Sequence, residues 1–141
     1  MGAIRKTYKG IKFKSILEVN CYKKLEASGL LFNYESEKVR LFKGKRIKNV
    51  HLYERKKNNK LMILKDNYKL FDMTYTPDFI ITKSSYKIYI DSKGHITDMY
   101  RLKKKMFLQH LSERKDGLTY LFFEPRNLTQ MDQVIDVIKK L

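Results

Sequence analysis

The chain has 141 residues and a formal net charge of +16, with 31 Lys and Arg against 15 Asp and Glu. That length fits one domain with a real core and is too short for two. The charge favours an extended acidic partner, nucleic acid above all, over a neutral small molecule. No apolar run is long enough to cross a membrane and the first ten residues lack a signal-peptide core, so we expect no membrane partner and a cytoplasmic location.

Cysteine and histidine chemistry is sparse in this sequence. Cys21 is the only cysteine, which excludes a disulfide framework and a four-cysteine zinc site within one chain. The three histidines are scattered without the spacing of metal ligands. Any metal chemistry must therefore rest on carboxylates.

The first predicted element after a basic arm or short edge strand over residues 1–14 is a helix. Apolar residues recur at helical spacing from Ser15 to about Ser28, with Ser15 as N-cap and Gly29 as C-terminal stop. Ser15 and Glu18 also form a capping-box pattern, in which Glu18 only bonds the backbone at the start of the helix. The spacing alone favours that structural role.

An extended segment with partial alternation is predicted over residues 30–42. Glu35 and Glu37 lie two apart and share a strand face, from which they could supply a further acidic group near a metal. We favour the alternative, in which they are exposed strand carboxylates paired with Lys38 or Arg40.

Two basic runs follow, at residues 43–49 and 54–60, with strand-like segments at 47–53 and 61–71. Together they predict a basic β-hairpin over residues 39–73 that extends the sheet. The sequence favours neither of two roles for this hairpin, an ordinary solvated loop or a DNA-contacting projection, over the other. The candidate phosphate contacts in this segment are Lys45, Arg46 and Lys48.

The most informative stretch runs from residue 75 to 94 and reads as a β-hairpin with its turn at Lys83-Ser84-Ser85. A tip at Ser84-Ser85 sets Asp78 directly opposite Asp91, on one face of the sheet. Opposed β-carbons lie roughly 4.5–5.5 Å apart, where like charges destabilise a sheet unless a cation compensates them.

Lys93 lies two residues beyond Asp91 and therefore shares its face. Taken singly, an Asp after a Pro is usually part of a turn, and an Asp and a Lys two residues apart on a strand usually form a solvent-exposed ion pair. Together, two carboxylates beside an ammonium suit a Mg²⁺ site for metal-assisted hydrolysis of a phosphodiester.

The last third of the chain predicts a helix from Thr97 to about Arg114, a buried strand over residues 118–124 in a βαβ crossover, and a final helix capped by Thr129. The expected buried stripe of the first of these helices is Leu102, Met106, Phe107, His110 and Leu111. The final helix presents Met131, Val134, Ile135, Ile138 and Leu141 at helical spacing. The predicted fold is α/β or α+β, with a central mixed β-sheet flanked by helices.

These residues resemble the PD-(D/E)xK nuclease superfamily. The likeness rests on Pro77-Asp78, on Asp91-Ser92-Lys93, on Glu18 in the preceding helix and on the basic helix that follows, and it runs from about Phe13 to Leu111. Within that group the chain is most similar to small phage-type endonucleases, including the junction-resolving endonuclease I. One departure is Asp91, where Glu is commoner and reaches one methylene further.

The resemblance implies a restriction-endonuclease-like core and a metal-dependent DNA endonuclease that cuts branched or structured DNA. Mg²⁺, or Mn²⁺ in its place, would be held by Asp78, Asp91, the backbone carbonyl of Ser92 and Glu18, while Lys93 would orient or deprotonate the attacking water. The DNA contacts on the basic helix would be Arg101, Lys103 and Lys105. Junction-resolving relatives act as homodimers, and a phage-encoded protein would work in the host cytoplasm.

Two other classes of function remain open at this stage. The chain could be a basic DNA-binding module without catalysis, or a nuclease subunit of a larger recombination or transposition complex. Metal dependence and substrate geometry distinguish these alternatives.

Overall fold

The computed structural model describes residues 6–55, 58, 61–65 and 67–141. The chain divides into two compact units. The first consists of Met1–Lys38 and Thr76–Leu141, and the second is Val39–Tyr75.

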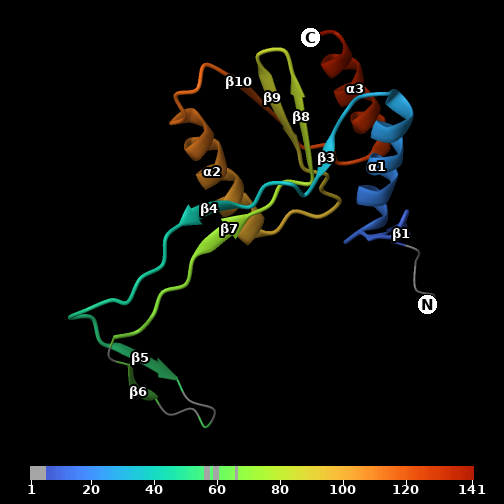
Figure 1. Ribbon diagram of the computed structural model, residues 1–141. Coiled ribbons are helices and arrows are strands. Elements are labelled where there is room, and N and C mark those ends of the chain that lie inside the picture. The colour runs from blue at the N-terminus through green and yellow to red at the C-terminus, as the bar shows by residue number, and fades with distance from the viewer. Residues whose placement is uncertain (1–5, 56–57, 59–60, 66) are drawn as a thin grey trace. The chain divides into compact units, whose positions relative to one another are not determined.

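The described residues of the first unit form three helices and six strands (Figure 1). The helices are α1 (Ile16–Ser28), α2 (Asp98–Ser112) and α3 (Leu128–Lys139). The strands are β1 (Thr7–Tyr8), β2 (Ile11–Lys12), β3 (Asn33–Tyr34), β8 (Phe79–Lys83), β9 (Tyr86–Ile90) and β10 (Thr119–Phe123). The short β1 and β2 pair with each other, and the other four strands form one sheet in the order β10-β9-β8-β3.

The central sheet is mixed, as predicted. Strands β8 and β9 are antiparallel, from Phe79 opposite Ile90 to Lys83 opposite Tyr86, which confirms the register expected from a tip at Ser84-Ser85. Strand β10 runs parallel to β9 after the α2 crossover, and β3 pairs antiparallel with β8. The α+β fold with a mixed sheet between helices is therefore confirmed.

Helices cover both faces of this sheet (Figure 1). Alternation along β8 and β9 sends Phe79, Ile81, Ile88 and Ile90 into a core with α1 and α3. The opposite face presents Tyr89, whose ring lies 5.0 Å from that of Phe107 on α2. The burial of these apolar side chains is the main contribution to the stability of the three layers, the sheet and the helices on its two faces.

The helix ends follow the capping rules. Ser15 caps α1 and Gly29 ends it in a left-handed conformation with φ of 79°, as predicted. The predicted N-cap Thr129 is wrong, because the side chain of Asn127 accepts from Gln130 N and starts α3 earlier. None of the helices in the described part of the chain is long and apolar enough to cross a membrane.

Helix α2 and strand β10 are less buried than the sequence predicted. On α2 the buried residues are Tyr100, Phe107 and Leu111, while Leu102 is 46% exposed. Leu102 is two residues from Tyr100, which at 3.6 residues per turn places it on the opposite side of the helix. Strand β10 is half-buried rather than buried because it lies at the edge of the sheet.

The second unit is a long two-stranded ladder. Strand β4 (Val39–Phe42) pairs with β7 (Met73–Tyr75), a bridge joins Arg46 and Lys69, and β5 (Leu52–Arg55) pairs with β6 (Leu61–Lys65). The expectation that this segment extends the central sheet is not met. In the described residues its strands pair only with one another.

Candidate metal centre

The site begins where the ladder between β8 and β9 ends. Asp78 precedes the first paired residue of β8 and Asp91 follows the last of β9, and their side chains are 4% and 1% exposed. Asp91 N donates to Phe123 O at 2.9 Å, and Lys93 N donates to Pro125 O at 3.0 Å. The backbone after β9 is therefore held against the end of β10, which fixes the positions of Asp91 and Lys93.

Asp78 is fixed by the segment that follows β9. Its Oδ2 accepts hydrogen bonds from Ser92 N and Ser92 Oγ, each at 2.9 Å. The predicted role for Ser92, a metal ligand through its carbonyl oxygen, is a separate one and stays a prediction. An oxygen of the same carboxylate also lies within 4.8 Å of an oxygen of Glu18 and of an oxygen of Glu35.

Glu18 lies in the first turn of α1 and is 2% exposed. Its backbone N donates to Ser15 Oγ at 3.0 Å, and its Oε1 accepts from Lys14 N at 2.7 Å. Its other oxygen, Oε2, is buried and has no hydrogen-bond partner among the described residues. Capping thus accounts for one carboxylate oxygen and leaves the second available to a ligand.

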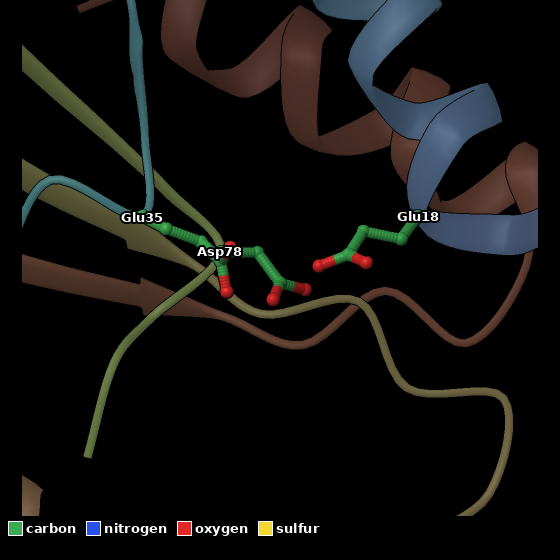
Figure 2. Close-up of side chains that lie close together, drawn as sticks. All are labelled: Glu18, Glu35 and Asp78. Atoms are coloured by element: carbon green, nitrogen blue, oxygen red, sulfur yellow. The ribbon is translucent and has the colours of Figure 1, made fainter. Parts of the chain in front are cut away.

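Glu35 is the third acidic residue of the site, although its place on a predicted strand favours an exposed carboxylate. Its backbone is left-handed, with φ of 47°, and its N donates to Asp78 O at 2.8 Å. One oxygen each of Glu18, Glu35 and Asp78 lie within 4.8 Å of one another. Figure 2 shows the carboxylate of Glu18 reaching from α1 toward that of Asp78, with Glu35 on the far side of Asp78.

The expected partners of the two strand glutamates are wrong. Glu35 pairs with Lys14, at 2.9 Å between Oε2 and Nζ. Glu37 pairs with Lys87 and accepts from the Tyr89 hydroxyl at 3.0 Å. These contacts tie the segment after β3 to neighbouring elements rather than to its own following residues.

The electrostatics of the cluster favour a cation. Burial, together with the nearby Asp91 and Glu18, raises the pKa of Asp78 to about 9, and Lys93 acts in the opposite direction. Burial and the carboxylates of Glu18 and Glu35 likewise raise the pKa of Tyr34. A set of oxygen donors that resists carrying its own negative charge fits a hard divalent cation such as Mg²⁺ or Mn²⁺.

Lys93 and Asp91 form an ion pair beside the cluster, with 2.9 Å between Nζ and Oδ1. The Lys93 ammonium also lies 4.5 Å from the centre of the Tyr100 ring. Asp91 does not belong to the three carboxylates that lie within 4.8 Å, so its role as a metal ligand stays a prediction. The pair nevertheless places a cation next to Asp78.

A cavity of about 260 Å³ opens at this point. Its lining brings together the acidic Glu18 and Asp78 and the basic Lys14 and Lys93; the other lining residues are Ser15, Leu17, Ser92, Gly94 and His95. Arg126 supports the rim, because its Nε donates to Lys93 O at 2.7 Å. The cavity therefore offers carboxylate oxygens and ammonium groups to one small polar ligand, such as a phosphate group.

The predicted DNA contacts fall in two places. Arg101 and Lys105 are exposed on α2 and Lys103 is half-buried there; Arg101 also pairs with Asp98 at 3.0 Å. The three others, all exposed, belong to the second unit: Lys45, Arg46 and Lys48. Three of the six candidates thus belong to each of the two units.

Comparisons of the chain with protein-family models, with characterised proteins and with solved structures find no match.

Proposed function

We propose that the protein is a metal-dependent DNA endonuclease that hydrolyses phosphodiester bonds in branched or otherwise structured DNA. The observation that carries this proposal is the cluster of the buried Glu18 and Asp78 with the half-buried Glu35, in which one Glu18 oxygen has no partner among the described residues. Lys93 at the same cavity and the net charge of +16 support a phosphate substrate over a neutral one.

The proposed cofactor is Mg²⁺, with Mn²⁺ as a substitute. Asp78 and Glu18 would hold it, with Glu35, Asp91 and the Ser92 carbonyl as further candidate ligands. A bound divalent cation polarises a phosphoryl oxygen and lowers the pKa of a bound water.

The chain's own residues would perform the remaining tasks. The Lys93 ammonium, held by Asp91, would orient the attacking water and stabilise negative charge that develops on the phosphate. Ser92 would keep Asp78 in place through its two hydrogen bonds. Arg101, Lys103 and Lys105 would contact phosphates along the DNA.

The proposal also includes the binding partner, the oligomeric state and the location of the protein. DNA is the partner, a homodimer would allow two sites to cut opposing strands, and the location would be the cytoplasm. The resemblance noted in the sequence supports each of these points, together with the basic composition.

Replacement of Lys93 tests the proposal. Lys93→Ala should abolish cleavage of a labelled branched DNA in Mg²⁺, while DNA affinity stays within about threefold, since one lysine among many cations contributes little to phosphate binding. The matched control is Lys115→Ala, which removes an exposed lysine away from the cavity and should cleave normally. Unchanged cleavage by Lys93→Ala would refute the assignment.

Cleavage by the wild-type protein distinguishes the proposed endonuclease from the alternative, a DNA-binding module without catalysis. A basic DNA-binding module would bind in a salt-sensitive way, without a Mg²⁺ requirement and without product.

A further inference from the structure

The second unit, Val39–Tyr75, concentrates positive charge. Its 37 residues hold eleven Lys and Arg against three acids, a net +8, which is half of the charge of the whole chain. Two of the acids are already engaged within the unit. Glu54 pairs with Lys65 at 2.8 Å, and Asp72 accepts from Gly44 N at 2.7 Å and faces Arg40 at 3.8 Å. The cations are therefore in large excess over the acids of this unit, which suits a polyanion.

The same unit exposes aromatic rings. Among the described residues, the large apolar side chains exposed on the first unit are all aliphatic or Met, whereas the second unit exposes Phe42, Tyr53 and Phe71 at 41%, 60% and 73%. The chain has 18 Phe and Tyr in all. Scattered exposed apolar residues are ordinary, but confinement of the exposed rings to the most basic unit is a pattern that burial alone does not explain.

Backbone irregularities lie next to two of these rings. The pairing of β4 with β7 shifts register between Arg40 and Phe42, and the pairing of β5 with β6 shifts between Tyr53 and Arg55. Such bulges twist a ladder and re-aim side chains. They offer a structural reason why the rings point outward.

The third ring lies at a close approach of the two strands. Leu70 N donates to Lys45 O at 2.8 Å, and a Cβ at Gly44 would collide with the backbone of Leu70 and Phe71. Glycine at position 44 therefore allows the two strands to approach beside Phe71. The ammonium of Lys69 lies 5.5 Å from the centre of the Phe71 ring, so a cation accompanies the exposed ring.

Cationic grooves with exposed rings bind unpaired nucleotides, because lysines follow the phosphates while each base stacks on an aromatic face. In a duplex the base faces are covered by their neighbours, and only the phosphates remain accessible. We propose that the exposed rings of Tyr53 and Phe71 each stack on unpaired bases of DNA. This inference rests on the proposed function and gives it a substrate class, namely DNA with a single-stranded or splayed segment.

The first test measures affinity, by fluorescence anisotropy in EDTA, for an oligothymidylate of about 20 nucleotides and for a duplex of equal length. The Tyr53→Ala, Phe71→Ala double variant should bind the single strand about tenfold or more weakly and the duplex within about twofold, with an unchanged salt dependence since no charge is removed. Tyr53→Phe keeps the ring and should bind normally. Leu31→Ala truncates an apolar residue of the first unit that is 89% exposed and should have no effect. Equal losses on both ligands, or no loss on either, would overturn the inference.

A spectroscopic test uses the absence of tryptophan from the sequence. Phe71→Trp gives the protein a single indole, whose fluorescence should be quenched by the oligothymidylate and not by the duplex. Leu31→Trp, at an exposed position of the first unit, should respond to neither. Equal responses of the two reporters would contradict stacking at Phe71. Binding in EDTA is independent of cleavage, so failure of the stacking inference leaves the nuclease test intact, and a stacking surface without any cleavage would reject only the nuclease.

Discussion

Replacement of Asp78 by Asn should stabilise the metal-free protein, and the effect should depend on pH. The ordinary pKa of this carboxyl is 3.8, and burial beside Asp91 and Glu18 raises it to about 9. Between these values the folded protein keeps a proton that the unfolded chain has released, so the free energy of unfolding falls as the pH rises through this window.

The magnitude follows from the size of the window. Each pH unit inside it costs at most about 1.4 kcal/mol, so we expect wild-type stability to fall by about 2 to 4 kcal/mol between about pH 5 and about pH 8 through this group. Asp78→Asn removes the charge and keeps an oxygen for Ser92 N and Oγ. Its amide can also donate to Glu18 Oε2, which has no donor among the described residues.

Urea unfolding in EDTA, followed by circular dichroism, measures the effect. The stability advantage of the variant over wild type should be about 2 to 4 kcal/mol larger at about pH 8 than at about pH 5. Mg²⁺ should stabilise wild type at the higher pH and leave the variant unchanged. Asp136→Asn, an exposed carboxylate on α3, should show no such dependence. A variant that is less stable than wild type at about pH 8, or equally offset at both pH values, would refute the reasoning.

Two further predictions concern the neighbours of the cluster. Ser15→Ala should lower the free energy of unfolding by about 1 kcal/mol through loss of the N-cap and leave Mg²⁺ affinity unchanged. Glu18→Gln should weaken Mg²⁺ binding, measured by calorimetry, by about tenfold or more and change the stability little. A loss of stability in Glu18→Gln with unchanged Mg²⁺ affinity would make Glu18 only a capping residue. Arg126→Gln should slow single-turnover cleavage about tenfold at unchanged DNA affinity, because Arg126 holds the Lys93 carbonyl. Weaker binding at an unchanged rate would make it a DNA contact instead.

Short-range sequence patterns were sufficient to predict the helix and strands that carry the residues of the site. The register of β8 and β9 follows from the turn at Ser84-Ser85, where Ser84 adopts the left-handed conformation with φ of 54°. Ser15 and Gly29 bound α1 for equally local reasons. Each of these features depends on residues close together in the sequence, so the pattern of residue types is enough to predict them.

The position of Glu35 could not be predicted in this way. It depends on the pairing of the two-residue strand β3 with β8 and on a left-handed backbone at a glutamate, neither of which has a sequence signal. Strand alternation instead favoured an exposed carboxylate. Only the tertiary contact between Glu35 N and Asp78 O places it in the cluster.

The relation between Asp78 and Asp91 was predicted only in part. The pleat places opposed residues on one face, but the ladder ends at the pair of Phe79 and Ile90, which follows Asp78 and precedes Asp91. Beyond that point hydrogen bonds decide the side-chain directions. Asp78 accepts from Ser92, which local spacing could not anticipate, while Asp91 pairs with Lys93, two residues further along the chain.

The most direct test of the central claim is cleavage of a labelled four-way junction and a matched linear duplex, in Mg²⁺ and in EDTA, by wild type and by Asp78→Ala. The account predicts cutting of the junction in preference to the duplex, lost both in EDTA and in the variant. Binding without cutting, identical in the two proteins, would contradict it and leave a basic DNA-binding protein whose buried carboxylates are structural.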